Sequence, residues 1–282
     1  MTVLLTGGMG RSAKPLAERL HAANIPFLIA NRSGVVPEPF RDRGVQFDWL
    51  DSSTYRLPFE ADKSIDRVYL IAPSSGDPIP PMKAFIDFAI QQGVKRFVLM
   101  SAAPAPIGGP MMGKVHEYLD SLGVEYCALR PSWFFENLVF SLAAWIREHN
   151  EIANAVKSGK IGWISNEDIA DVAFKALTDS AIEHNNPIMV GPELLTFAQI
   201  ADLFTDILGR KIAYREVTPT ESKEIILKQG RTEEFAEMKS KLEGLLAEGL
   251  EERCYYQADF VGKRTMREFI EERKAAWEVG HA

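Results

Sequence analysis

The sequence predicts an α/β fold built on a doubly wound parallel sheet, followed by a smaller, mainly helical C-terminal lobe. Three observations lead to this fold class. Short apolar runs alternate with helical patterns through the first two thirds of the chain, a glycine-rich turn follows the first run, and mixed-charge helical patterns occupy the last third. Short apolar runs are typical of strands buried on both faces of a parallel sheet, with helices as crossovers.

Each apolar run is assigned to a strand. The strands are expected at residues 3–5, 27–30, 68–72, 97–100 and 126–129, and one more is expected to end within 47–51. Helical spacing of apolar residues predicts helices from Ala13 to Leu20 and around residues 85–90. Further helices are expected over 197–208, closed by Gly209, and within 220–252.

The expected domain organisation follows from this order of elements. Residues 1–160 form a dinucleotide-binding domain, to which residues 161–190 return, and residues 191–282 form a smaller lobe that binds or covers the substrate. We see no internal repeat and no low-complexity linker between the two parts.

Composition excludes several classes of partner. The chain has 282 residues with 32 Lys and Arg against 39 Asp and Glu, a formal net charge of −7, which disfavours nucleic acid and anionic membranes. The two cysteines, Cys127 and Cys254, lack CxxC spacing, so neither a disulfide framework nor a metal site is expected. The first residues do not resemble a secretory signal, and the longest near-apolar run, 138–146, is far shorter than the roughly 20 residues of a membrane span. We therefore expect a cytoplasmic protein whose partner is a small molecule.

A glycine-rich turn directly follows the first strand. The segment Thr6-Gly7-Gly8-Met9-Gly10-Arg11-Ser12-Ala13 satisfies both G-x-G-x-x-A and T-G-x-x-G-x-x-A. Glycines permit a tight turn and let backbone amides approach a pyrophosphate, and a small residue at the third position lets helix and strand pack closely. The sequence therefore predicts a Rossmann-type dinucleotide site, with a purely structural glycine turn as the alternative. The expected contacts from this turn are Thr6, Gly7, Gly8, Gly10, Arg11, Ser12 and Ala13.

The end of the second strand indicates which dinucleotide binds. NAD sites usually place a carboxylate there, whereas Arg accommodates the 2′-phosphate of NADP. Here the residues are Asn31, Arg32 and Ser33, and no carboxylate follows until Glu38. A guanidinium matches phosphate geometry, so the predicted cofactor is NADPH or NADP, with Arg11 as a possible second cation. The alternative is that Arg32 is a solvated loop residue.

Other cofactor contacts are expected where further strands end, because ligands of open α/β sheets lie outside the carboxyl ends of the strands. These are Asp48, Trp49, Ile71, Ala72, Pro73 and Ser101. Ser74 also follows the 68–72 run. For Asp48 and Asp51, turn or cap chemistry is an equally good interpretation.

Several segments together resemble one family, the NmrA-like atypical short-chain dehydrogenases. They are residues 6–10, Arg32, 114–117, 129–137 and 167–173, and the resemblance covers nearly the whole chain. The closing segment 260–277 resembles the family's final helix, so a helix is expected there. Within that family, residues 2–8, 47–51, 85–89 and 109–116 look like fungal festuclavine and agroclavine dehydrogenases of ergot alkaloid synthesis. The resemblance implies NADPH-dependent reduction of the cyclic iminium that forms when chanoclavine-I aldehyde closes on its own secondary amine. An alkaloid substrate and an upstream enzyme that produces the aldehyde are the partners it implies.

One departure from related enzymes bears on mechanism. Neither the Tyr-x-x-x-Lys pair of short-chain dehydrogenases nor the lysine of isoflavone-reductase-like relatives is present, and the latter position would match Met112. A ketone reductase needs an acid or an oxyanion donor, whereas an iminium carbon is already electrophilic and hydride addition yields a neutral amine. We therefore assign no catalytic proton donor. The alternatives are a dinucleotide-binding regulator without turnover and a quinone or enone reductase.

Residues after the last parallel strand are the candidate substrate contacts. The aromatic run Trp133, Phe134 and Phe135 offers stacking and cation–π attraction of about 0.5 to 2 kcal/mol, with ordinary core packing as the alternative. Asn137 and Glu136 contact the ligand or cap the helix that starts near Leu138. The remaining candidates are Tyr69, Ala102 and Lys114, and His116 lies on the same expected helix as Lys114.

Overall fold

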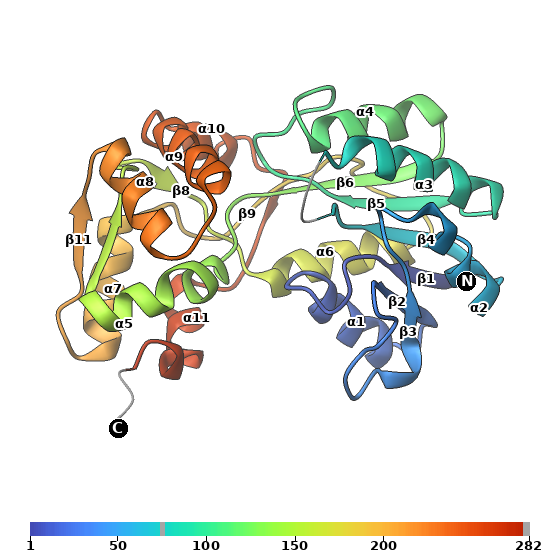
Figure 1. Ribbon diagram of the computed structural model, residues 1–282, viewed down its shortest axis with the longest axis horizontal. Coiled ribbons are helices and arrows are strands. Elements are labelled where there is room, and N and C mark those ends of the chain that lie inside the picture. The colour runs from blue at the N-terminus through green and yellow to red at the C-terminus, as the bar shows by residue number, and fades with distance from the viewer. Residues whose placement is uncertain (74–76, 279–282) are drawn as a thin grey trace. The chain divides into compact units, whose positions relative to one another are not determined.

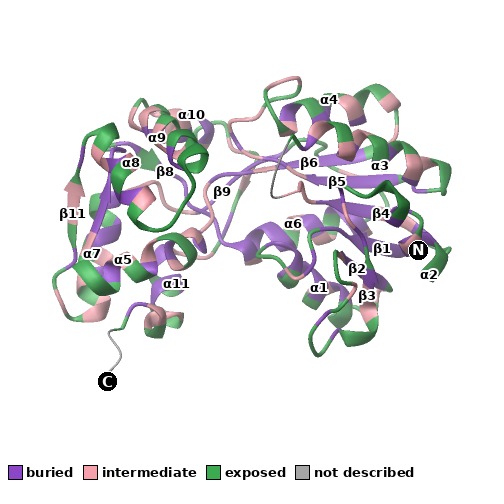
Figure 2. Cartoon of the chain, viewed as in Figure 1, coloured by how far each residue is buried: buried purple, intermediate pink, exposed green. Residues whose placement is uncertain are grey.

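The computed structural model describes residues 1–73 and 77–278, and Ser74 therefore lies outside the described residues. The chain divides into two compact units. The first comprises Met1–Pro131 and Asn166–Ile188, and the second comprises Ser132–Ser165 and Met189–Ala282. The main strands are mostly buried, as Figure 2 shows for β4, β5 and β6.

The first unit is built on a parallel sheet (Figure 1). Its strands are β1 (Thr2–Leu5), β2 (Phe27–Asn31), β3 (Gly44–Gln46), β4 (Ile65–Leu70), β5 (Arg96–Met100) and β6 (Glu125–Pro131). Within the described residues the sheet order is β12-β9-β6-β5-β4-β1-β2-β3, and neighbours from β6 to β3 run parallel. The order reverses around β1, which is the switch point of a doubly wound fold, so the predicted fold class is confirmed.

Helices cover both faces of this sheet. They are α1 (Ala13–Ala22), α2 (Leu57–Ala61), α3 (Ile79–Gln91), α4 (Met112–Leu122) and α6 (Asn166–Thr178), with 3₁₀ turns at Arg41–Arg43 and Ser52–Thr54. In Figure 1, α3 and α4 lie on one side of the sheet and α1 and α6 on the other. The apolar spacing from Ala13 to Leu20 becomes the buried face of α1, because every residue of that spacing is buried.

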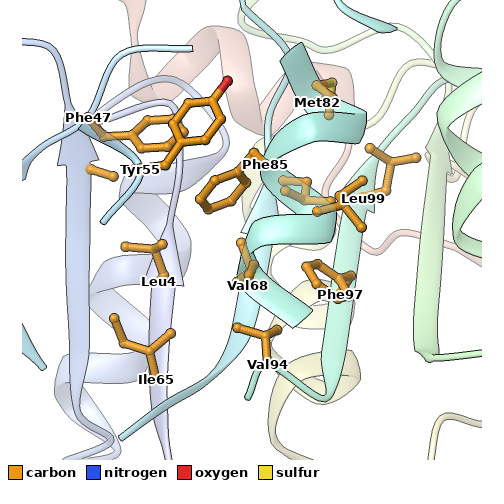
Figure 3. Close-up of a cluster of buried hydrophobic side chains, with 14 of the residues drawn as sticks. Leu4, Phe47, Tyr55, Ile65, Val68, Met82, Phe85, Val94, Phe97 and Leu99 are labelled. Atoms are coloured by element: carbon orange, nitrogen blue, oxygen red, sulfur yellow. The ribbon is translucent and has the colours of Figure 1, made fainter. Parts of the chain in front are cut away.

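Residues 47–51, where the third strand was expected to end, contribute to an aromatic cluster between the sheet and α3. The ring of Phe85 lies 4.8 Å from that of Phe47, 5.4 Å from that of Trp49 and 5.3 Å from that of Tyr55, centroid to centroid (Figure 3 labels all but Trp49). Strand β3 ends at Gln46, and the following residues form a tight turn closed by a bridge between Asp48 and Asp51. The expected strand end at 47–51 is therefore wrong by at least one residue: the Phe47 amide still donates to the carbonyl of Asn31 at 2.8 Å, but the chain then turns and no longer pairs with β2.

The second unit combines short strands with helices. Its elements are a π-helical turn (Leu138–Leu142), α5 (Ala143–His149), β7 (Glu151–Asn154), β8 (Lys160–Ile161), β10 (Leu195–Thr196), α7 (Phe197–Leu208), β11 (Ala213–Glu216), α8 (Pro219–Lys228), α9 (Glu233–Ala247), α10 (Leu250–Tyr255), β12 (Phe260–Val261), α11 (Met266–Glu272) and a 3₁₀ turn (Lys274–Ala276). Strand β9 (Ile188–Val190) begins in the first unit and ends in the second. Strand β8 pairs antiparallel with β10, and β7 pairs parallel with β11.

The predicted helix 197–208 is confirmed as α7. Thr196 and Gln199 form a reciprocal capping box at its start, and Gly209 takes the left-handed conformation (φ +67°) that ends it. The closing segment 260–277 differs from the expected single helix, because Phe260 and Val261 pair with β9 before α11 begins. Met266, Phe269, Ile270 and Trp277 all enter the core of the second unit.

The chain crosses between the units earlier than the sequence indicated. Residues 132–160 were expected in the first domain, but Phe135, Leu138, Ile146 and Ile152 pack into the core of the second unit. The helix expected near Leu138 opens as a π-helical turn and becomes α5 only at Ala143. Residues 161–165 also belong to the second unit, and the chain returns to the first at Asn166, the start of α6.

Candidate functional site

The glycine turn follows β1 and is fixed by Thr6. The Thr6 hydroxyl donates to the carbonyl of Tyr69 at 2.9 Å and accepts from the amide of Ile71 at 2.8 Å. Gly7 has φ +86°, and a Cβ there would lie 2.9 Å from the Ile71 side chain. Only glycine suits that position, because both the backbone angle and the space exclude a side chain.

The next residues lead into the N-terminus of α1. Gly8 has φ +61° and donates its amide to the carbonyl of Ala30 at 3.0 Å, which ties the turn to β2. A Cβ on Gly10 would lie 3.1 Å from the carbonyl oxygen of Gly7. The N-cap residue Ser12 makes no side-chain capping bond, and the first turn of α1 carries no acidic residue. The helix N-terminus therefore keeps its positive field and its amide donors for an anion, which fits a pyrophosphate.

Arg32 lies in the turn that follows β2. Asn31 shapes this turn: its side-chain amide donates to the carbonyl of Val35 at 3.0 Å, and its oxygen accepts from the amide and hydroxyl of Ser33 at 3.0 and 2.9 Å. Arg32 is exposed and pairs with no residue that the structure describes. Asn31 and Ser33 thus shape the turn with their side chains, whereas the guanidinium of Arg32 remains exposed.

Three of the other expected cofactor contacts, Asp48, Trp49 and their neighbour Asp51, take part in a turn or in the core. Asp48 accepts from the amide of Leu50 at 3.0 Å, and Asp51 accepts from the amide and hydroxyl of Ser53, which lowers the pKa of Asp51. Both carboxylates therefore do the turn chemistry that was the alternative interpretation. Trp49 is 9% exposed and packs in the aromatic cluster, so its ring is a core residue in this structure rather than a ligand surface.

The remaining expected contacts lie at the carboxyl ends of β4 and β5. Ile71, Ala72 and Pro73 follow β4 and are half-buried, and Ala102 follows β5 with similar exposure. Ser101 is 8% exposed, donates its amide to the carbonyl of Leu129, and has a hydroxyl without a hydrogen-bond partner in the described part of the chain. A buried hydroxyl of this kind at the end of a central strand is suited to binding a ligand.

The polar candidates in β4 and α4 are not placed as proton donors. Tyr69 is fully buried in β4, and burial raises the pKa of its hydroxyl. Lys114 is half-exposed and its ammonium lies 3.3 Å from the Glu117 carboxylate. His116 is fully buried with its ring 5.4 Å from that of Tyr126, and burial, with help from Arg130, lowers the His116 pKa. The buried position of Tyr69 excludes the substrate contact expected of it in this conformation.

The aromatic residues 133–135 of the second unit differ in how far they are buried. Phe135 is 1% exposed and its ring lies 5.2 Å from that of Phe269, so core packing accounts for it. Trp133 and Phe134 are half-buried and pair with the chain at Ile164, whose amide donates to the carbonyl of Trp133 at 2.9 Å. Asn137 is half-buried and its amide donates to the carbonyl of Phe134. Trp133, Phe134 and Asn137 are the members of this segment that retain surface for a ligand.

Sequence reasoning missed two buried carboxylates and a lysine near this segment. Glu251 is 2% exposed and accepts from the Ser132 hydroxyl at 2.7 Å, and burial raises the pKa of Glu251 to about 7. The ammonium of Lys239 lies over the Trp133 ring, 4.6 Å from its centroid, and 3.6 Å from the Glu243 carboxylate. Helical spacing of Lys239 and Glu243 was visible in the sequence, but nothing there indicated that the pair is internal.

The structure defines the class of protein first. A parallel sheet that reverses its order at β1, with a glycine turn leading into an uncapped helix N-terminus, is a dinucleotide-binding α/β fold. The model of the NmrA-like family matches residues 1–270, and the chain therefore belongs to the NmrA-like family. The family predicted from the sequence is thus confirmed. None of the described helices has the length and apolar character needed to cross a membrane.

Named relatives are similar over most of the chain. Festuclavine synthase II of Penicillium roqueforti is 43% identical over 251 residues, which cover 86% of this chain and 87% of the relative. Agroclavine dehydrogenase of Claviceps purpurea (strain 20.1) is 41% identical over 290 residues, covering 98% and 99%. Among solved structures, the NADPH-dependent quinone oxidoreductase QOR2 of Escherichia coli superposes with a TM-score of 0.77 at 20% identity, covering 96% and 99%. At that identity the likeness supports the fold alone.

Proposed function

We propose that this protein is an NADPH-dependent reductase of a cyclic iminium derived from chanoclavine-I aldehyde. The product is a clavine alkaloid such as festuclavine or agroclavine. The observation that carries the proposal is identity near 40% over nearly the whole chain to proteins named agroclavine dehydrogenase and festuclavine synthase. The first unit binds the cofactor in this proposal, and the second unit supplies substrate contacts.

The chain's own residues support NADPH as the cofactor. The amides of the Gly7–Gly10 turn and the N-terminus of α1 hold the pyrophosphate, and exposed Arg32 holds the 2′-phosphate. Ser101 offers its buried, unpartnered hydroxyl to the bound ligand. When bound, the cofactor supplies a hydride.

Three of the polar candidates are poorly suited to deliver a proton, which supports a C=N bond over a C=O bond as the acceptor. Reduction of a ketone needs a group that protonates or stabilises the developing alkoxide. Of the candidates, Tyr69 is fully buried, His116 is buried with a lowered pKa, and Lys114 is bound to Glu117. An iminium carbon accepts hydride without proton delivery, so this chain's role is to orient the substrate and exclude water.

The test is NADPH consumption, followed by fluorescence, with a preformed cyclic iminium, a quinone or no substrate. We expect turnover with the iminium, and at least tenfold tighter binding of NADPH than of NADH, about 1.4 kcal/mol. Arg32→Ala should lose that preference, and Arg41→Ala, which removes another exposed arginine of the same region, should keep it. Consumption with the quinone alone indicates a quinone reductase, and binding without consumption indicates a regulator.

A further inference from the structure

Tyr69, in β4, lies beside the start of the glycine turn. In the sheet it stands opposite Leu5, the last residue of β1. Its carbonyl accepts from both the amide and the hydroxyl of Thr6, at 3.0 and 2.9 Å. The backbone of Tyr69 is therefore bound to the residue at which the turn begins.

The side chain of Tyr69 points to the face of the sheet that α1 covers. Its neighbours Val68 and Leu70 belong to the cluster that contains Phe85 of α3, and successive side chains of a strand point to opposite faces. Helix α1 lies on the side of the sheet opposite α3 (Figure 1). Burial raises the pKa of Tyr69, and the nearby hydroxyl of Ser12, at the N-terminus of α1, partly opposes that rise. The Tyr69 hydroxyl therefore stays protonated at neutral pH and can act as a donor.

The fold itself makes no use of the Tyr69 hydroxyl. Tyr69 is fully buried, and its hydroxyl has no hydrogen-bond partner among the residues that the structure describes. Ser12 is 7% exposed, and its side chain does not cap α1. A buried hydroxyl without a partner costs stability, so phenylalanine would suit this core better than tyrosine. The Tyr69 hydroxyl is thus left for a role when a ligand is bound.

We propose that Tyr69 is a positioning residue for the dinucleotide: its hydroxyl donates to the Ser12 hydroxyl, which in turn donates to a pyrophosphate oxygen. A serine hydroxyl that accepts one hydrogen bond directs its own proton elsewhere, here to the anion at the N-terminus of α1. The inference rests on the proposed function only for the identity of the cofactor. It replaces the substrate contact first expected of Tyr69.

The first experiment measures NADPH affinity by fluorescence titration and stability by urea unfolding of the cofactor-free protein. Tyr69→Phe should weaken NADPH about fivefold, the loss of one hydrogen bond, while its free energy of unfolding stays unchanged or rises. Tyr55→Phe is the matched control, because Tyr55 is also buried in the first unit but its hydroxyl donates to the carbonyl of Trp49 at 2.8 Å. This control should lose stability and keep the NADPH affinity of wild type.

The second experiment tests whether Tyr69 acts through Ser12. Ser12→Ala should weaken NADPH about tenfold, because a bond to a charged phosphate is lost, and Ser12→Thr, which keeps a hydroxyl, should restore most of the affinity. Adding Tyr69→Phe to Ser12→Ala should have no further effect, since the two hydroxyls act as one unit.

A second ligand separates the pyrophosphate from the rest of the cofactor site. Adenosine 2′-monophosphate carries the 2′-phosphate but no pyrophosphate, and its affinity is measured by calorimetry. Tyr69→Phe should leave this affinity unchanged, whereas Arg32→Ala should weaken it.

Four results overturn the proposal. They are an unchanged NADPH affinity in Tyr69→Phe, an equal loss of affinity with and without Ser12, an equal loss for adenosine 2′-monophosphate, or a loss of stability as large as that of Tyr55→Phe. Iminium turnover is measured in the same preparations. NADPH binding that depends on Tyr69 without turnover supports the positioning role and contradicts the proposed function. Turnover with an NADPH affinity that ignores Tyr69 contradicts the positioning role alone.

Discussion

The buried carboxyl of Glu251 gives a quantitative prediction for stability. Glu251 lies in the first turn of α10, is 2% exposed and accepts from the Ser132 hydroxyl at 2.7 Å. Burial raises its pKa from the ordinary 4.5 to about 7. Glu251→Gln replaces the carboxyl with a neutral group of the same shape that still offers an oxygen to Ser132.

The sign of the effect follows from proton binding. The folded protein keeps a proton on Glu251 up to about pH 7, whereas the unfolded chain releases it near pH 4.5. The stabilising contribution is therefore fully present below pH 4.5 and is lost as the pH rises through 7. One pKa unit corresponds to about 1.4 kcal/mol, so the loss between these limits is about 3 kcal/mol.

Urea unfolding of wild type and Glu251→Gln from pH 4.5 to 8 measures this loss. The free energy of unfolding of the variant, relative to wild type, should rise by about 3 kcal/mol across the range. Glu248→Gln removes an exposed carboxylate at the end of α9 and should show no such rise. A constant difference between Glu251→Gln and wild type at all pH values would refute the reasoning.

Three further predictions concern the first unit. Gly10→Val should abolish NADPH binding in a folded protein, because even the Cβ of a side chain there would lie 3.1 Å from the Gly7 carbonyl oxygen. An unchanged affinity in a fluorescence titration would mean that the phosphate site is elsewhere. Arg96→Met should lower the free energy of unfolding, measured by urea unfolding, by about 3 kcal/mol, because the buried guanidinium donates to carbonyls at the end of α6. Arg56→Met, which removes an exposed ion pair, should cost under about 1 kcal/mol. Lys114→Met should lose less than about tenfold in kcat with a preformed iminium, which is below the roughly 10²- to 10⁴-fold rate contribution of a general acid. A hundredfold loss in kcat with intact NADPH affinity would indicate a carbonyl or enone reductase.

The sequence predicted what depends on local pattern. The glycine turn is a local signal, because Gly7 takes a φ of +86° that favours glycine. The helix 197–208 is local as well, since Thr196, Gln199 and Gly209 set both of its ends. These signals also sufficed to predict the fold class, because alternating strands and helices leave few arrangements of a parallel sheet.

The contacts that the sequence did not predict join residues far apart in the chain. Phe135 packs against Phe269, which lies more than a hundred positions later in the chain. The division of the chain at Ser132 likewise depends on contacts with distant residues. Trp49 and Trp133 are the same residue type after similar strands, yet one packs against Phe85 and the other under Lys239. Hydrophobic pattern alone cannot distinguish a ring that faces the core from one that keeps a surface.

The most direct test of the account follows the hydride itself. NADPH deuterated at the transferred position is supplied to the protein with chanoclavine-I aldehyde, and the products are analysed by mass spectrometry. Reduction of the cyclic iminium predicts one deuterium on a carbon next to nitrogen in a clavine product, with one NADPH consumed per molecule formed. Deuterium in an open-chain alcohol would contradict the account, because it would show that the protein reduces the carbonyl rather than the C=N bond.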